Sequence, residues 1–321
     1  MIYILFFILI FAAELAYFRL ADHFNIIDKP NQRSSHTSIT LRGGGIVFYI
    51  GVLLYFALEG FQYPWFYMGL TLLSIISFAD DIRPQSSKLR LIVHFMAMAL
   101  MFYQWGLLEM PWYNSVIALV ICTGILNAYN FMDGINGLTG GYSLVVIGAL
   151  CYINSVQLNF VDNGFIYTFI IALLVFNFFN FRKKARCFAG DIGAMSAAFI
   201  IVFLLGFLIF KTRDFSYIVL LAVYGVDRAL TVIHRLILHE NIFEAHRKHL
   251  FQLMANELKM PQLLVSSIYG LLQGFIAVGL ILAGSFAYLY LIIVIFVLSI
   301  VYIVLMKKYY CLHQMSSKTE V

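Results

Sequence analysis

Five short stretches of this sequence combine carboxylates, carboxamides, cations and glycines in spacings that suit phosphate and metal chemistry. In FADDIRPQSSKLR, Asp80 and Asp81 are adjacent, and Lys88 and Arg90 follow within a few residues. Neighbouring carboxylates repel one another unless a cation neutralises them, which predicts a Mg2+ site with the two basic side chains near phosphate oxygens. The alternative is a solvated helix end, although the C-terminus of a helix disfavours anions.

The second stretch is NAYNFMDGINGLTGG, residues 127 to 141. Asn127, Asn130 and Asp133 recur every three residues, so on a helix they lie roughly along one face. These side chains suit the edge of a nucleobase or a hydrated metal, and the glycines that follow let a ligand approach the backbone closely. The alternative is a polar loop that simply ends a helix.

The third stretch is FRKKARCFAGDIGAM, residues 181 to 195, where four cations precede Phe188 and Asp191. Asp191 stands just before an apolar run, where Asp commonly caps a helix. A third carboxylate on the same membrane face would also serve a Mg2+-diphosphate site. Phe188 is either a packing residue or a stacking platform, and the four cations are explained by topology as well as by direct roles.

The fourth stretch is HRLILHENIFEAHRKHLFQ, residues 234 to 252, in the longest polar loop. His246, Arg247, Lys248 and His249 form a cationic cluster suited to a diphosphate, whose oxygens favour Arg forks and His donors. The spacing of the two histidines would also suit Zn2+, but no third ligand is evident. A basic loop that only fixes the topology is the other alternative.

The fifth stretch is DKPNQRSSHTSITLRGGG, residues 28 to 45, which Pro30 and the glycine triplet mark as a loop. Its five charged or ionisable residues, Arg42 among them, exceed what a linker needs. Any single one of them is better explained by solvation than by catalysis.

Apolar helices must position these stretches. Hydrophobic residues make up 62% of the 321, charged residues 12%, and the mean hydropathy is +0.90, which excludes soluble, disordered and disulfide-stapled classes. Because a spanning helix needs about 20 mostly apolar residues, we predict an all-α, polytopic membrane protein. It has about eleven transmembrane helices, at 1-21, 43-60, 64-79, 89-105, 112-127, 138-155, 163-180, 194-210, 215-232, 262-283 and 286-306.

The charges predict the orientation. The first apolar run has no basic residue before it and no small-residue cleavage site after it, so we expect a retained helix with the N-terminus outside. Alternate loops and the tail then share one side and, with Arg90 and Arg228 at adjoining helix ends, hold 18 of the 21 Lys and Arg residues. By the positive-inside rule that side is cytoplasmic, and all five stretches lie on it.

Together, the stretches resemble a known family. DKPNQRSSH, RGGG, the Asp80-Asp81 pair, NAYNFMDGINGL, FAGDIG and HRKHLFQ follow the motif order of polyprenyl-phosphate N-acetylhexosamine-1-phosphate transferases. This group, of the MraY and WecA types, belongs to glycosyltransferase family 4. The motifs run from residue 28 to about 252, and the resemblance implies one membrane-embedded domain over 1-321 with its active site on cytoplasmic loops.

The reaction that the resemblance implies moves a sugar-1-phosphate from a UDP-N-acetylhexosamine to undecaprenyl phosphate and releases UMP. The implied cofactor is Mg2+, with Mn2+ as an alternative. The expected location is a bacterial inner membrane, with membrane lipids as partners. A homodimer is a further expectation, and no nucleic acid is expected to bind. A one-step attack by the lipid phosphate and a two-step route through an aspartyl-phosphate both fit.

Roles follow from the motifs residue by residue. Asp80 and Asp81 would form the aspartate pair, with Asp81 the better candidate to deprotonate or orient the lipid phosphate. Asp191 would bind Mg2+ with Asn130 close by. The remaining expected roles are the nucleotide pocket for Asn127, Asn130 and Asp133, uracil stacking for Phe188, diphosphate contacts for His246, Arg247 and His249, and help with phosphate or sugar charge from Lys88 and Arg42.

Departures from the family pattern narrow the substrate. The triple-His run of the MraY type is absent, which argues against a muramoyl-pentapeptide substrate. The HRKHLFQ and RSSH forms are similar to the branch that starts O-antigen, capsule or other surface glycans, so UDP-GlcNAc is the first expectation and a deoxy-amino sugar the next. A secondary transporter and an intramembrane prenyltransferase are the alternatives, but no internal repeat and no paired Asp motifs support them.

Overall fold

A helical bundle makes up nearly all of the computed structural model, which describes residues 2–30, 35, 39–241 and 247–319, the last seven by backbone only. The main helices are α1 (Ile2–His23), α2 (Ile46–Glu59), α3 (Pro64–Ile82), α4 (Ser87–Gln104), α5 (Trp112–Met132), α6 (Leu138–Tyr152), α7 (Asn163–Asn180), α8 (Gly190–Thr212), α9 (Ala222–Ile237), α11 (Gln262–Ala283) and α12 (Ala287–Thr319).

Short elements connect these helices. They are α10 (Leu250–Gln252), the 3-10 turns η1 (Leu107–Glu109), η3 (Phe215–Leu221) and η5 (Gly284–Phe286), and the π turns η2 (Ile153–Gln157) and η4 (Leu253–Glu257). The described strands, β1 (Ile27–Asp28) and β2 (Thr40–Leu41), form an antiparallel pair in which Ile27 lies opposite Leu41.

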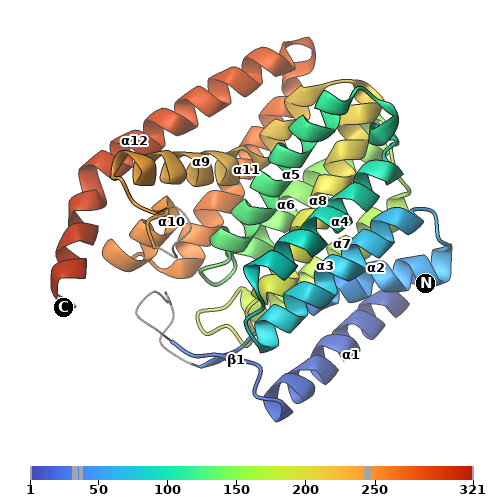
Figure 1. Cartoon of the computed structure of the whole chain (residues 1–321), viewed down its shortest axis with the longest axis horizontal. Helices are drawn as coiled ribbons and strands as arrows, with labels where there is room; N and C mark the ends of the chain where they lie inside the picture. The colour runs from blue at the N-terminus through green and yellow to red at the C-terminus, as the bar shows by residue number, and fades with distance from the viewer. Residues whose placement is uncertain (1, 31–34, 36–38, 242–246, 320–321) are drawn as a thin grey trace.

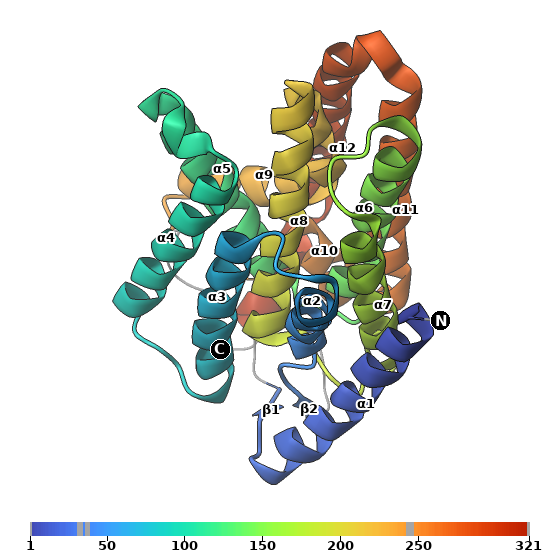
Figure 2. The ribbon, with the colours of Figure 1, turned by 90° about the vertical axis from the view of Figure 1, so that its right-hand side faces the viewer.

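Helix α8 is the central helix of the bundle (Figure 2), and 83% of its most apolar 18-residue window is buried inside the molecule. It packs against α2, α3, α5 and α6. Phe66, near the start of α3, stacks on Phe203, in the second half of α8, with ring centroids 3.8 Å apart. The two helices are therefore antiparallel, so the end of α3 meets the start of α8.

Each predicted span overlaps a helix of the structure. Among the described residues, eight helical segments are apolar and long enough to cross a membrane, and one of them runs from Gln262 to Leu312 through both α11 and α12. The chain is thus an all-α, multi-pass membrane protein, as predicted. Eleven crossings stay a prediction, because α2 has only 14 residues and α4 does not meet the same criterion.

Two boundaries differ from the prediction in ways that affect the chemistry. Helix α3 continues through Ile82 and α5 through Met132, so Asp80, Asp81 and Asn130 lie in last helical turns and not in the loops that follow the predicted spans. The predicted spans were bounded by hydropathy, and the polar side chains in these last turns made them look like loops. The backbone there is rigid, which fixes where the side chains point.

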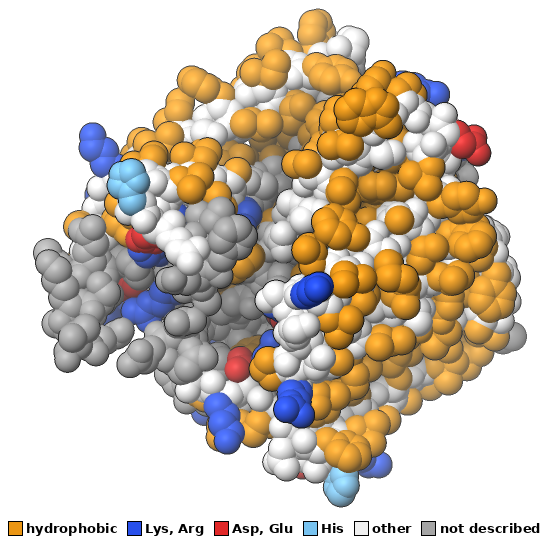
Figure 3. Space-filling view, in the orientation of Figure 1, with side chains coloured by type: hydrophobic (Ala, Val, Ile, Leu, Met, Phe, Trp, Pro, Cys, Tyr) orange, Lys and Arg blue, Asp and Glu red, His pale blue; other side chains and the backbone are white. Residues whose placement is uncertain are grey.

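The polar stretches meet at one end of the bundle. In Figure 1 the strand pair lies near the lower edge and α10 lies above it on the left, and Leu41 of β2 pairs with Cys187 just before α8. On the face drawn in Figure 3, hydrophobic side chains cover the right-hand part, and charged side chains gather around a hollow on the left and along the lower edge. This end of the molecule holds the candidate site.

Candidate functional site

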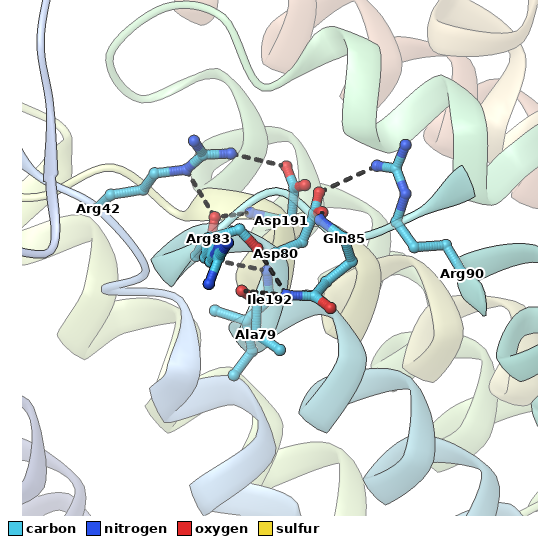
Figure 4. A network of polar contacts seen from close by, with 9 residues as sticks. Arg42, Ala79, Asp80, Arg83, Gln85, Arg90, Asp191 and Ile192 are labelled. Carbon is cyan, nitrogen blue, oxygen red and sulfur yellow. Dashed lines mark hydrogen bonds and ion pairs between the residues drawn. The ribbon is translucent and has the colours of Figure 1, made fainter. Parts of the chain in front are cut away.

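An acidic cluster occupies the junction of α3 and α8. Asp80 and Asp81 lie in the last turn of α3, and Asp191 is the second residue of α8. Figure 4 shows Arg42 and Asp191 pointing toward one another, with Arg90 approaching Asp80 from the other side. Three carboxylates from two separate motifs are therefore brought together by the fold.

Asp81 holds the start of α8. Its two carboxylate oxygens accept hydrogen bonds from the backbone amides of Asp191 (2.9 Å) and Ile192 (3.0 Å), and its side chain is fully buried. The first amides of a helix have no partner inside the helix, and a carboxylate there also interacts favourably with the helix dipole. Asp81 thus acts as a cap supplied by another helix.

Glycines allow this contact. Gly190 has a φ of +71°, and a Cβ at that position would lie 2.6 Å from Oδ2 of Asp81. A Cβ on Gly193 would lie 2.7 Å from the Cα of Gly45 in the RGGG loop. A larger residue at either place would push α8 away from its neighbours, which explains the GDIG and RGGG patterns physically.

Arg42 bridges two of the carboxylates. Its Nε lies 2.6 Å from Oδ1 of Asp81, and a terminal nitrogen lies 3.2 Å from Oδ1 of Asp191. Burial alone would lower the pKa of Arg42, but the negative charges of Asp81 and Asp191 outweigh it and raise the pKa. The guanidinium stays charged and is one-third exposed, so it can also meet an anionic ligand.

Asp80 faces the other side of the cluster. It accepts a hydrogen bond from the backbone amide of Gln85 (2.6 Å) and forms an ion pair with Arg90 (3.0 Å). Lys88 is exposed in the first turn of α4 and, within the described part of the chain, makes none of the cluster's contacts. Its phosphate role stays a prediction.

The second motif ends α5. Asn127 and Asn130 are half-buried on the helix, and Asp133 follows its last residue and accepts a hydrogen bond from Thr139 Oγ1 at 2.7 Å. Burial raises the pKa of Asp133 to about 6, the charge of Asp81 adds to this, and the Thr139 bond opposes it. Asp133 is therefore coupled electrostatically to the acidic cluster.

Phe188 lies in an extended segment beside β2. Its amide donates to the carbonyl oxygen of Leu41 (2.8 Å), and its own carbonyl oxygen accepts from Gly44 (2.9 Å). Leu41 also pairs with Cys187 as an isolated parallel bridge. These bonds fix the RGGG loop against the FAGDIG stretch and hold the half-buried ring of Phe188 two residues before Gly190.

The predicted cationic cluster is spread over several environments. His249 is only 1% exposed, and its Nδ1 lies 3.1 Å from Oδ1 of Asp227. Arg247 approaches Glu257 at 3.8 Å, and Lys248 forms an ion pair with Glu240. His246 falls outside the described residues. The segment therefore combines partly buried ion pairs with one buried histidine.

Phe131 connects this second region to α5. The guanidinium of Arg228 lies 3.9 Å from the centre of the Phe131 ring, a cation-π distance, and the ring centroid of His249 lies 6.3 Å away. Because Asp133 follows Phe131 by two residues, the end of α5 faces the acidic cluster on one side and His249 on the other.

Two buried residues that matter here were not singled out from the sequence. Asp227 lies within a predicted span, where an ionisable residue is itself a signal. Asn180 accepts from the Gly137 amide and donates to the Cys187 carbonyl oxygen, at 2.8 Å each. It ties the NAYNFMDGINGL and FAGDIG stretches together, and a lone Asn at a helix end carries little signal.

The donor chemistry fits Mg2+. Among the described residues no group of three or more His, Cys, Asp or Glu side chains is spaced as a complete metal site. Mg2+ needs no such cage, because it commonly takes one or two carboxylates, several waters and substrate phosphates. Asp191 and Asp80 keep carboxylate surface exposed, at 19% and 11%, whereas Asp81 is fully committed to α8 and Arg42.

Comparisons with known proteins agree with this site. The family model described as glycosyl transferase family 4 matches residues 63–210, which include all three aspartates of the cluster but neither Arg42 nor His249. A probable undecaprenyl-phosphate N-acetylglucosaminyl 1-phosphate transferase of Bacillus subtilis is 24% identical over 259 residues, which cover 72% of this chain and 70% of the relative.

Enterobacterial relatives are similar over a shorter segment. Undecaprenyl-phosphate alpha-N-acetylglucosaminyl 1-phosphate transferases of Yersinia pestis and Salmonella typhi are 28% and 25% identical over 207 residues. In each case the match covers 58% of this chain and 56% of the relative. The chain thus spans about half the length of these two relatives.

Proposed function

Because residues 63–210 match the model of glycosyl transferase family 4, we propose that the chain transfers N-acetylhexosamine-1-phosphate from a UDP-sugar to undecaprenyl phosphate and releases UMP. The observation that carries the proposal is the cluster of Asp80, Asp81 and Asp191 around Arg42, at the polar end of an apolar bundle. A lipid phosphate and a soluble nucleotide can meet there. The names of the relatives support UDP-GlcNAc as the first sugar to test.

The reaction replaces the phosphoanhydride bond to UMP by a phosphoanhydride bond to the lipid phosphate. An oxygen of the lipid phosphate attacks the phosphorus that carries the sugar, the bond from that phosphorus to the bridging oxygen breaks, and UMP leaves with the electron pair. Such a transfer needs little covalent work from the protein, so positioning and neutralisation of charge supply most of the catalysis.

Asp191 and Asp80 would hold Mg2+, with Asn130 as the further predicted ligand. The bound ion would neutralise the diphosphate and the charge that develops during the attack. Arg42 would contribute a guanidinium fork to the same phosphates from its exposed side. Because both oxygens of Asp81 accept amide bonds, the geometry favours Asp80 or Asp191 over Asp81 as the group nearest the lipid phosphate.

The nucleotide would lie between the end of α5 and the FAGDIG stretch. Phe188 would stack on uracil, and Asn127 and Asp133 would contact the uridine. The charge distribution supports a cytoplasmic site, since 18 of the 21 Lys and Arg residues lie on the same predicted side of the membrane as the site. The product would be the first lipid-linked sugar of a surface glycan.

The test is a reaction of purified protein with undecaprenyl phosphate, Mg2+ and a panel of UDP-N-acetylhexosamines. We expect UMP and a lipid-linked sugar to form in equal amounts with at least one sugar. Omission of the lipid phosphate is the matched control. Transport of the UDP-sugar across vesicles without any UMP would instead support the transporter, and the proposal would be wrong.

A further inference from the structure

A second buried carboxylate, Asp227 of α9, lies outside the acidic cluster and is only 3% exposed. Four donors surround it. Its Oδ1 lies 3.1 Å from Nδ1 of His249 and 3.2 Å each from the Leu250 amide and the Thr231 hydroxyl, and its Oδ2 accepts from Tyr269 at 2.6 Å. Every oxygen of this carboxylate is therefore used by a protein group.

This arrangement identifies the proton in the contact with His249. An ionised carboxylate is an acceptor only, and three of its partners here are hydroxyl or amide donors. A carboxylate that gathers this many donors is stabilised in its ionised form. The hydrogen between Asp227 and His249 consequently belongs to the imidazole, and Nδ1 is the protonated nitrogen.

Local contacts hold the backbone of His249. The residue immediately precedes α10, which continues directly into η4, and its backbone amide donates to Oε1 of Gln252 at 3.2 Å. Asp227 binds both the ring of His249 and the next backbone amide, that of Leu250, so one side chain fixes ring and backbone together.

Asp227 is in turn fixed by two other helices. Tyr269 belongs to α11, and the hydroxyl of Thr231 is 2.8 Å from that of Tyr302 on α12. The rings of Phe131 and Phe251 also lie near the imidazole of His249, with ring centroids 6.3 and 5.7 Å from it. The imidazole therefore has little freedom to rotate.

We propose that Asp227 is a positioning residue for the phosphoglycosyl transfer: it accepts the Nδ1 hydrogen of His249 and so fixes the orientation of the imidazole toward the substrate diphosphate. The identity of the substrate in this inference rests on the proposed function. The protonation of the imidazole nitrogens does not, because it can be measured without turnover. Carboxylates that orient a histidine in this way commonly contribute about 10- to 100-fold or more to activity.

Two variants separate positioning from packing. Asp227→Asn keeps the size of the side chain but removes the charge, and it should lower kcat/KM about 10- to 100-fold. Tyr269→Phe is the matched control, because it removes a bond to the other oxygen of the same carboxylate and leaves the His249 contact intact. It should keep kcat/KM within about threefold while lowering the melting temperature, since it leaves a buried acceptor with one donor fewer.

A double-mutant cycle tests whether Asp227 acts through His249. If it does, Asp227→Asn should cost no more than about twofold in a His249→Ala background, because the group that it positions is already absent. A full additional loss in the double variant would mean that Asp227 acts by another route, and the proposal would be wrong.

The decisive readout is the 15N NMR spectrum of protein labelled in its histidines, with the His249 signals assigned by their absence in His249→Ala. Wild-type protein and Tyr269→Phe should show a protonated Nδ1 at His249, and Asp227→Asn should lose that preference. An unprotonated Nδ1 in the wild-type protein would overturn the proposal whether or not any UDP-sugar reacts. Conversely, absent UMP release with a protonated Nδ1 would contradict the proposed function and leave the Asp227–His249 pairing standing.

Discussion

The two buried carboxylates Asp81 and Asp227 perform the same structural task in opposite electrostatic settings. Each accepts backbone amides at the start of another helix, α8 for Asp81 and α10 for Asp227. Asp81 has two further carboxylates nearby, and Arg42 and Arg90 neutralise only part of that charge. Asp227 has four donors and no carboxylate partner in its described contacts.

This difference separates binding from orientation. The cluster at α3 and α8 carries an excess of negative charge and partly exposed oxygens, which is the condition under which a cation and a diphosphate bind. The Asp227 region is saturated with hydrogen bonds and buried, which is the condition for holding one side chain still. We therefore assign charge neutralisation to the first region and orientation of His249 to the second.

Asp191→Asn should produce the largest effect. The substitution keeps the volume but removes the charge that we assign to the metal, so turnover should fall by about 10³-fold. Its side chain is 19% exposed and caps no helix, so the melting temperature in detergent should change little. UMP release and thermal unfolding are the two measurements, and most of the wild-type activity in this variant would remove Asp191 from the mechanism.

Asp81→Asn should instead lose stability together with activity. An amide has one acceptor oxygen in place of two, so the start of α8 and Arg42 both lose a partner in a fully buried place. We expect a cost of about 2–4 kcal/mol, seen as a clear fall in melting temperature. An unchanged melting temperature would show that the bonds of Asp81 to α8 are not important for the fold.

Arg42→Lys should have a moderate effect. Lysine keeps the charge but cannot bridge Asp81 and Asp191 at once, because it lacks the planar fork. We expect a loss of about tenfold in kcat/KM, against a larger loss for Arg42→Ala. Equal losses in the two variants would mean that only the bridging geometry of the guanidinium matters and its charge does not.

The smallest expected effect concerns pH. The pKa of Asp133 is raised to about 6 by burial, so the folded state holds this proton more tightly than the unfolded state does. The resulting stability is complete below the ordinary pKa of about 4 and is lost as pH rises through 6. Asp133→Asn should remove this part of the pH dependence of the melting temperature between pH 4 and 7. An identical profile for the variant would contradict the assignment.

The helices and the acidic residues were predictable because hydropathy and motif order are local properties of the chain. Asp80, Asp81 and Asp191 were each identified as site residues from the sequence, and the fold brings them together. Their partners were harder to predict, since Arg42 is separated from Asp191 by 149 positions and no periodicity records that contact. The capping of α8 by Asp81 was likewise invisible, because it depends on two antiparallel helices meeting end to end.

Asp227 shows a different limit of sequence reasoning. It stands in a predicted span next to Arg228, which was counted as a topology cue, and Asp227 itself was assigned no role. Its role becomes visible only when α9, α10 and α11 are assembled, because its partners His249 and Tyr269 follow it by 22 and 42 positions. The shortness of α2 was also unexpected, since the glycines on either side of it end the helix earlier than its hydropathy suggests.

The most direct test of the central claim is to follow the two phosphorus atoms of the UDP-sugar separately. With 32P at the phosphorus next to the sugar, the account predicts that the label moves into the lipid together with the sugar. With 32P at the phosphorus next to uridine, the label should appear in UMP. Release of UDP carrying both labels would mean that the sugar–oxygen bond breaks instead, and it would contradict the assignment of this site to sugar-1-phosphate transfer.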